Sequence, residues 1–259
     1  NQRIEAGESR ATRQDAGLYR LKKLGLAVAD LFFPPRCVGC QLLGAWLCTG
    51  CIAEIERICP PICQQCGLPP DTHGVDGSCT IPPPLDGLRA CAFHSGPLRE
   101  AIHDFKYRDL TALALPLGQL MAGAWAVLDG GWLAQAVVPV PLHAHRQRQR
   151  GYNQSALLAR ELASALQLPL LDGVLQRVKA TLPQVGLDVE QRRINVHDAF
   201  RCAPGVVSGR SVLLVDDVCT TGATLASAGR SLKDAGASSV LAYTLARAKP
   251  PGQQPFVLD

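Results

Sequence analysis

Residues 212–215, with the sequence V-L-L-V, give the clearest structural signal in the pattern of hydrophobic and polar positions along the chain. An apolar run without alternation is typical of a strand that is buried on both faces, as in a parallel sheet covered by helices. Residues 225–235 have a helix-forming composition, and Gly236 supplies a stop signal after them. The pattern therefore predicts a strand, a loop and a helix in this order.

The same pattern predicts similar elements upstream. Pro97 stands at a favoured first position of a helix, and apolar residues follow it at a spacing that forms one buried stripe. The stripe consists of Leu98, Ile102 and Phe105. Lys106 and Arg108 fall outside it, so we expect them at a solvent-exposed edge. Helices are also expected at residues 116–128 and 155–167, and strands near 88–93, 136–140 and 240–245. This alternation predicts an α/β fold, with a central, mostly parallel sheet flanked by helices.

The length and composition of the chain fit a globular protein of one or two domains, with 259 residues, 47% hydrophobic and 19% charged. No apolar run is expected to reach the ~18–20 residues that span a membrane. The apolar residues 24–33 are interpreted as a buried or docking helix and not as a secretory signal. These features predict a cytoplasmic protein without a membrane span. The net charge of +4 does not by itself indicate any class of partner.

Eight of the eleven cysteines lie in one short segment, between Cys37 and Cys79. In a chain for which no signal sequence is expected, such crowding indicates metal binding more than disulfides. Three C-x-x-C pairs occur here, and each such turn can present two thiolates to one tetrahedral Zn²⁺. The pairs are Cys37 with Cys40, Cys48 with Cys51, and Cys63 with Cys66. Structural zinc is therefore predicted, with disulfides or a redox-active pair as the alternative.

The first two pairs offer the four thiolates that a closed zinc site needs. A second site has three evident ligands, Cys63, Cys66 and Cys79, and both His73 and Cys59 are candidates for the fourth. The sequence leaves open how the three pairs combine.

Three consecutive prolines, at 82–84, mark a boundary after the cysteine-rich segment. The predicted division is an N-terminal extension and helix (1–34), a zinc-ribbon region (35–85) and a larger domain (86–259).

A segment with the features of a phosphate site follows the strand at 212–215. Asp216 and Asp217 come directly after the strand, at the sheet edge where open α/β sheets bind ligands. Next comes a hydroxyl-rich loop at the start of a helix, where backbone amides and hydroxyl groups can bind a phosphate monoester. The loop residues are Thr220, Thr221, Gly222, Ala223 and Thr224. Because adjacent carboxylates can accept hydrogen bonds from vicinal hydroxyl groups or hold hydrated Mg²⁺, the segment predicts a site for a phosphorylated sugar such as ribose 5-phosphate.

Two other interpretations of this segment compete. The acidic pair can merely cap the following helix. A receiver domain also contains an apolar strand that ends in two aspartates, but it needs roughly 120 residues after that strand, and only 42 residues follow Asp217.

The most basic part of the chain follows the strand predicted at 136–140, and no carboxylate occurs between Asp129 and Glu161. Its Arg146, Arg148 and Arg150 can make charge-assisted contacts to a diphosphate or to nucleic-acid phosphates. An exposed basic loop is the alternative. Further on, the long polar connection at 179–200 is interpreted as a closing flap or as an exposed hairpin.

Several of these segments resemble those of a known family. The strand, the acidic pair and the T-T-G-A-T loop resemble the phosphoribosyl diphosphate (PRPP) signature of type I phosphoribosyltransferases. Three further segments extend the resemblance: the cysteine pairs after F-P-P-R-C, the V-P-V-P-L segment with R-x-R-x-R-G-Y-N-Q-S, and the stretch K-x-T-x-x-Q…R-x-x-N…A-F. Together these segments resemble the ComF family of competence-associated proteins over residues 32–246. Family members usually carry a second cysteine pair near Cys79, which this chain lacks.

The resemblance implies a zinc ribbon joined to a type I phosphoribosyltransferase domain. Asp216 and Asp217 would then bind the ribose 2- and 3-hydroxyl groups of PRPP, and residues 220–224 would surround its 5-phosphate. A short loop after a strand, together with arginines, would bind the diphosphate and its Mg²⁺. The connection at 179–200 would close over the site. The residues implied for the diphosphate are Pro141, Leu142, His143, Arg146 and Arg150.

The implied function is transfer of a phosphoribosyl group from PRPP to an acceptor, with Asp216, Asp217 and Arg146 at the reacting centre and a link to DNA uptake. No segment indicates the acceptor. Weak candidates for a general base are His143, His145 and Lys179.

Two further hypotheses belong to other classes. The first is a non-enzymatic accessory protein of DNA uptake, which binds single-stranded DNA through the arginines and the zinc knuckles and keeps a vestigial or regulatory PRPP site. Against it stands the aromatic content of 5%, because binding of single strands uses aromatic side chains for stacking. The second is a scaffold whose zinc region binds a partner protein.

Overall fold

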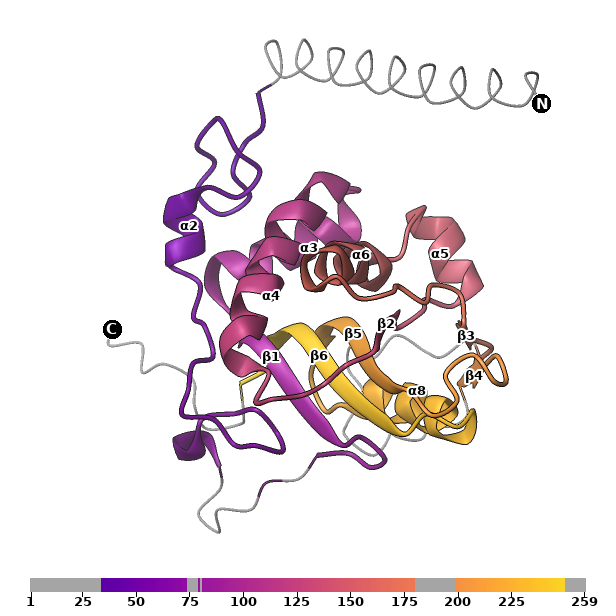
Figure 1. The fold of residues 1–259 in the computed structure, drawn as a ribbon. Coiled ribbons are helices and arrows are strands. Elements are labelled where there is room, and N and C mark those ends of the chain that lie inside the picture. Colours follow the sequence, from indigo (N-terminus) through magenta and orange to yellow (C-terminus); the bar gives the residue numbers. More distant parts are fainter. Residues whose placement is uncertain (1–33, 74–78, 80, 180–198, 250–259) are drawn as a thin grey trace, which may run out of the picture.

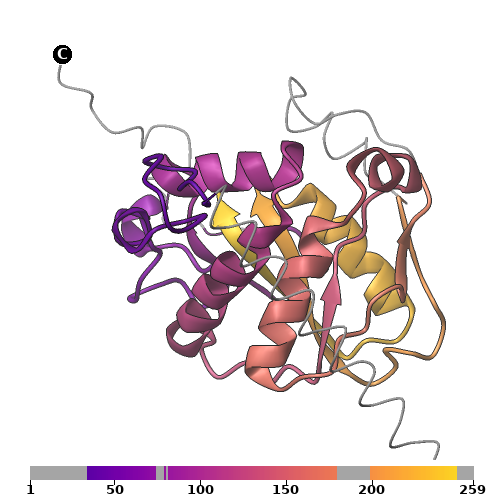
Figure 2. The same ribbon diagram turned by 90° about the horizontal axis from the view of Figure 1, so that it is seen from above.

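A four-stranded parallel sheet forms the centre of the computed structural model, which describes residues 34–73, 79, 81–179 and 199–249. The strand order is β1-β6-β5-β2 (Figure 1). Because all neighbouring strands pair in parallel, their carboxyl ends meet at one edge, as the arrowheads of β2, β5 and β6 indicate (Figure 2). The strands are β1 (Gly87–Phe93), β2 (Ala136–Pro139), β5 (Ser211–Cys219) and β6 (Ser239–Arg247).

Helices cover both faces of this sheet, which confirms the predicted α/β class (Figure 1). In β5, Leu213 and Val215 pack with the helices of one face, whereas Val212 and Leu214 pack with the other face. Residues 212–215 are therefore buried on both sides, as the unbroken apolar run predicts. One face carries α3 (Gly96–Tyr107), α4 (Ala114–Leu128) and α6 (Gln154–Leu166). The other carries α8 (Ala223–Asp234) and a hairpin of β3 (Leu175–Arg177) and β4 (Phe200–Cys202).

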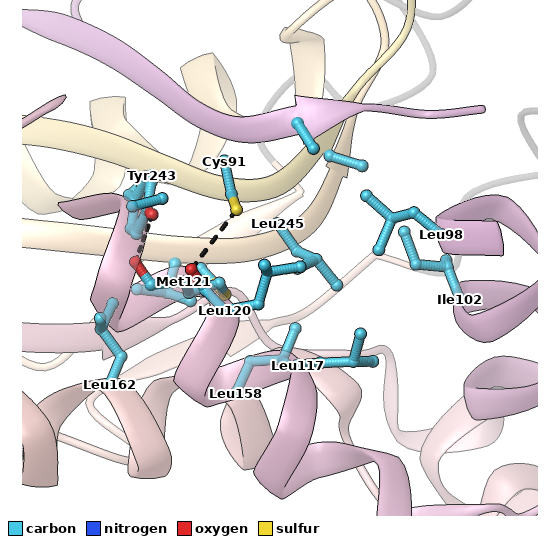
Figure 3. Packing of buried hydrophobic residues seen from close by; sticks show 14 of the residues in the cluster. Cys91, Leu98, Ile102, Leu117, Leu120, Met121, Leu158, Leu162, Tyr243 and Leu245 are labelled. Carbon is cyan, nitrogen blue, oxygen red and sulfur yellow. Dashed lines mark hydrogen bonds between the residues drawn. The ribbon is translucent and has the colours of Figure 1, made fainter. Parts of the chain in front are cut away.

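The largest of the three hydrophobic clusters among the described residues lies between the sheet and α3, α4 and α6 (Figure 3). Two polar groups within it find backbone partners on α4. The Tyr243 hydroxyl donates to the Met121 carbonyl oxygen at 2.6 Å, and the Cys91 thiol donates to the Leu120 carbonyl oxygen at 3.5 Å. The buried polar atoms therefore tie β1 and β6 to α4 without the cost of an unpaired donor.

Contrary to the expectation that no apolar run reaches the length of a membrane span, one segment of the described residues reaches the lower end of that length. The 3₁₀ turn η2 (Thr111–Leu113) and α4 together form an 18-residue helical segment that is long and apolar enough by length and composition. Half of this segment is buried inside the fold, where Leu117 and Met121 are fully enclosed. Its apolar composition is explained by packing in the core.

The cysteine-rich region lies along the outer edge of β1 (Figure 1). Its regular elements are α2 (Thr49–Ala53) and the 3₁₀ turn η1 (Pro70–Thr72). Backbone amides of Ile58, Phe93 and Leu88 bond to carbonyl oxygens of Cys91, Glu56 and Gln65 at 3.1, 2.9 and 2.9 Å. These bonds satisfy groups that an exposed edge strand would leave unpaired. The division of the chain at residues 85 and 86 stays a prediction.

The remaining predicted elements agree with the structure within one to three residues at their ends. Six elements of the described residues were not predicted: α2, η1, η2, β3, β4 and α5 (Ala144–Arg150). Nearly all of the predicted N-terminal extension and helix, and most of the connection at 179–200, lie outside the described residues.

Candidate functional site

The acidic pair lies at the carboxyl edge of the sheet, within the last four residues of β5. The strand extends beyond residue 215 because β6 continues to pair with it, with Asp216 opposite Thr244. On the other side β2 ends with Pro139 opposite Val215. Asp216 therefore lies just beyond the end of β2, at the position where an open parallel sheet leaves room for a ligand.

The carboxyl group of Asp216 accepts two hydrogen bonds. The Ser155 hydroxyl donates to Oδ1 of Asp216 at 2.6 Å, and the Asp217 amide donates to the same oxygen at 2.9 Å. Burial and the neighbouring Asp217 carboxylate raise the pKa of Asp216 to about 7, although the Ser155 hydrogen bond acts in the opposite direction. Asp216 therefore changes its charge near neutral pH.

The expectation of a solvent-exposed Lys106 was wrong. Its Nζ lies 2.8 Å from Oδ1 of Asp217, and the two side chains are only 21% and 11% exposed. Lys106 stands in the last turn of α3, where a long side chain can reach over the sheet edge. Arg108, by contrast, is exposed as predicted and pairs with Asp104 at 3.3 Å.

The loop after β5 surrounds a small concavity. Gly222 has φ = 77°, a left-handed conformation that favours glycine, and it precedes α8. The Ala223 amide donates to Oγ1 of Thr221 at 3.4 Å. The predicted loop residues and Asp216 thus line one hollow at a helix N-terminus, whereas Asp217 is not among the residues that line it. It is lined by Asp216, Val218, Cys219, Thr220, Thr221, Gly222, Ala223, Thr224 and Leu225.

The loop after β2 lies beside the acidic pair. The Val140 amide donates to the Val215 carbonyl oxygen at 2.9 Å, and the Asn153 side chain donates to the Val140 carbonyl oxygen at 3.0 Å. Pro141, Leu142 and His143 follow Val140, whose backbone these two hydrogen bonds hold in place. His143 begins α5, where its Nδ1 accepts from the His145 amide at 3.3 Å, and it forms an isolated bridge with Arg177 of β3.

The basic segment is a helix, not a loop, and this separates its arginines. Residues four apart lie on one side of a helix, whereas a residue two positions away lies on the other. Accordingly Arg146 and Arg150 are partly buried and Arg148 is exposed. The Arg150 guanidinium donates to Gln154 Oε1 at 2.7 Å and lies 5.1 Å from the centre of the Tyr107 ring. Arg150 is therefore held against α6 and the end of α3.

Residues of the G-Y-N-Q-S segment after α5 make structural contacts. Gly151 ends α5 with φ = 77°, and the Tyr152 hydroxyl donates to the Phe105 carbonyl oxygen. Asn153 caps α6 by accepting from the Ser155 amide at 3.2 Å. Ser155 and Lys106 were not predicted as parts of the site. Ser155 stands in the quoted motif, but no sequence spacing connects Lys106 to Asp217.

The first cysteine cluster fits a tetrahedral metal ion. The four ligand atoms lie within 4.8 Å of one another, and Cys40 Sγ and Cys48 Sγ are 3.6 Å apart. This is close to the edge of roughly 3.7 Å that Zn–S bonds of about 2.3 Å give in a tetrahedron. Burial opposes ionisation of Cys37, but backbone amides around its sulfur lower its pKa to about 6, which favours the thiolate. The ligands are Cys37, Cys40, Cys48 and Cys51.

The second cluster has a mixed ligand set, and His73 supplies its fourth ligand. Cys63 Sγ lies 3.3 Å from Cys79 Sγ, and Cys66 Sγ lies 3.2 Å from His73 Nε2. Of the two candidates for this position, Cys59 is exposed and lies outside the cluster. A Cys₃His set suits a closed structural zinc site. In the described residues the first two C-x-x-C pairs therefore form one ligand set, and the third pair belongs to a separate set with His73 and Cys79.

Comparisons with known proteins agree with this architecture. Residues 28–80 match a family model described as a double zinc ribbon domain, and residues 153–255 match one described as a phosphoribosyl transferase domain. Among solved structures, a glutamine PRPP amidotransferase from B. subtilis is similar with a TM-score of 0.33 and 24% identity, covering 51% of this chain and 25% of that chain.

Two curated relatives are similar over nearly their full length. Competence protein F of Haemophilus influenzae is 34% identical over 230 residues, which cover 84% of this chain and 99% of that protein. DNA utilization protein YhgH of Escherichia coli K12 is 34% identical over 228 residues, with the same two coverages. The chain therefore belongs to the ComF family, and joins a double zinc ribbon to a phosphoribosyltransferase-type domain.

Proposed function

We propose that the protein binds PRPP with Mg²⁺ at the carboxyl edge of the sheet and transfers its phosphoribosyl group to an acceptor, in a role connected with DNA uptake. The observation that carries this proposal is the meeting of three segments. The loop before α8 directly follows β5, the strand that carries the acidic pair, and the Val140–Val215 hydrogen bond holds the loop after β2 beside that strand. The names of the curated relatives, which refer to competence and DNA utilization, support the biological context.

Each part of the site matches one part of PRPP. The loop amides and hydroxyl groups of residues 220–224 suit the 5-phosphate. Asp216 and Asp217 suit the two ribose hydroxyl groups, because a carboxylate accepts hydrogen bonds strongly. Residues 141–143, which follow β2 beside the strand of the acidic pair, and Arg146 of α5 suit the diphosphate.

Positioning and charge stabilisation would account for the chemistry. The acceptor forms a bond to C1 as the bond between C1 and the diphosphate oxygen breaks, and the acceptor gives up its proton. Negative charge then develops on the leaving diphosphate, where the guanidinium of Arg146 can stabilise it. Bound Mg²⁺ would supply further positive charge there. Because the cysteine clusters need reduced thiols, we place the protein in the cytoplasm.

The test is calorimetric titration of PRPP into zinc-loaded protein with and without Mg²⁺. We expect micromolar, Mg²⁺-dependent binding by the wild type and by Asp234→Asn, which changes an exposed aspartate at the far end of α8. The double variant Asp216→Asn/Asp217→Asn should bind at least about 10-fold more weakly, because each lost charge-assisted hydrogen bond costs about 1.5–3 kcal/mol. Equal affinity of this variant, or no heat from folded wild type, would refute the ribose assignment.

Binding of single-stranded DNA is the second candidate, and the orientation of α5 favours it. Arg148 and His145 face solvent. Each phosphate neutralised by an arginine contributes about 0.7 to the slope of log affinity against log salt for single strands. Arg148→Ala should lower that slope by about 0.7 for an oligonucleotide measured by fluorescence anisotropy, and Arg230→Ala, on exposed α8 surface, should leave it unchanged. Equal slopes in the two variants would exclude α5 as the DNA surface.

A further inference from the structure

Lys106 is the one side chain from α3 that the described residues show in contact with the acidic pair. Its ion pair with Asp217 is sheltered, whereas the Arg108–Asp104 pair one turn away has an arginine that is 68% exposed. Solvent and salt screen a sheltered pair less than an exposed one. The ammonium of Lys106 therefore acts strongly on the groups around it.

Asp216 lies within reach of the same ammonium. Burial and Asp217 raise its pKa to about 7, while the charge of Lys106 lowers it. Without Lys106 two adjacent, sheltered carboxyl groups would compete for charge, and protonation of Asp216 would become easier. The titratable and charged groups that face the acidic pair are Lys106 of α3, Arg177 of β3, Cys219 of β5 and, after β1, His94.

We propose that Lys106 is a positioning residue of the ribose site, which fixes the Asp217 carboxylate and keeps the acidic pair able to accept hydrogen bonds near neutral pH. The assignment to a ribose rests on the proposed function, whereas the action of Lys106 on the pair does not. An ionised carboxylate accepts hydrogen bonds from hydroxyl groups more strongly than a protonated carboxyl group, one oxygen of which carries the proton and acts as a donor. Ligand binding therefore releases the proton of Asp216, and affinity rises with pH through the pKa of Asp216 and levels off above it.

The first measurement needs no ligand. Carbon-13 NMR of labelled aspartate carboxyl groups, assigned with Asp216→Asn, follows the titration of Asp216 between pH 5 and 9. We expect the titration midpoint of Asp216 to be about one pH unit higher in Lys106→Met than in the wild type. In Lys106→Arg the midpoint should be that of the wild type again. The matched control is Lys233→Met, because Lys233 pairs with Asp86 at the same 2.8 Å and is 25% exposed, away from the site. Thermal unfolding of each variant shows that the fold is retained.

The second measurement is the affinity for PRPP and Mg²⁺ across the same pH range. A midpoint higher by one unit should weaken binding by Lys106→Met up to about tenfold at neutral pH and much less at pH 9. A folded Lys106→Met protein with the wild-type midpoint would overturn the inference. A shifted midpoint in a protein whose wild type binds no PRPP would instead refute the proposed function and support the action of Lys106 on the acidic pair.

Discussion

Removal of zinc should unfold the cysteine-rich region and open the outer edge of β1. The apparent binding free energy of structural zinc in zinc-finger peptides is about 10–16 kcal/mol at pH 7, which equals or exceeds the roughly 5–15 kcal/mol that stabilises a whole domain. Here the ion-binding segments also supply hydrogen bonds to β1, through Glu56, Ile58 and Gln65. We expect two zinc ions per chain by elemental analysis, and a marked loss of amide-exchange protection in β1 after chelation.

Substitution of one ligand distinguishes the two zinc sites. His73→Ala removes a ligand of the second site only, so this variant should lose one of its two zinc ions to a chelator more readily than the wild type. His103→Ala is the matched control, because His103 is an exposed residue of α3 and lies outside both clusters. A fully chelated protein that keeps the protection of β1 would show that the zinc region does not hold this edge.

The contrast between Asp216 and Lys106 shows what the sequence could predict. Asp216 and the loop at 220–224 belong to one continuous segment, so a local pattern was enough to place them beside a buried strand and a helix N-terminus. Lys106 reaches the same site from α3, and Ser155 bonds to Asp216 across 61 residues of sequence. Contacts of that kind depend on how helices pack on the sheet, which no local period encodes.

The basic segment shows a different limit. Its charges were evident, but the helix α5 has no apolar stripe to reveal it, since none of its residues is buried. The helical geometry, which turns Arg148 away from Arg146, could therefore not be read from the residues. The fourth ligand of the second zinc site is similar, because His73 is identified only when the chain brings it next to Cys66.

Arg89→Met should destabilise the protein by about 3 kcal/mol or more, since each carbonyl oxygen that loses its buried donor costs about 1–3 kcal/mol. Arg89 of β1 is fully buried and lies 4.2 Å above the Trp132 ring. Its guanidinium donates to the carbonyl oxygens of Leu128 at 2.8 Å, Leu88 at 3.0 Å and Gln64 at 3.0 Å. One side chain thus joins the end of α4, the edge strand and the turn between two zinc ligands.

Thermal unfolding measures the effect, with an expected fall in the melting temperature of about 6–12 °C at this chain length. Arg89→Lys should recover little, because one ammonium cannot reach three carbonyl oxygens that a planar guanidinium spans. Arg201→Met, at an exposed arginine of β4, should stay within about 0.5 kcal/mol of the wild type. Because Gln64 lies between Cys63 and Cys66, Arg89→Met should also release the second zinc ion more readily. A melting temperature equal to that of Arg201→Met would mean that the zinc knuckle and the sheet are joined by other contacts.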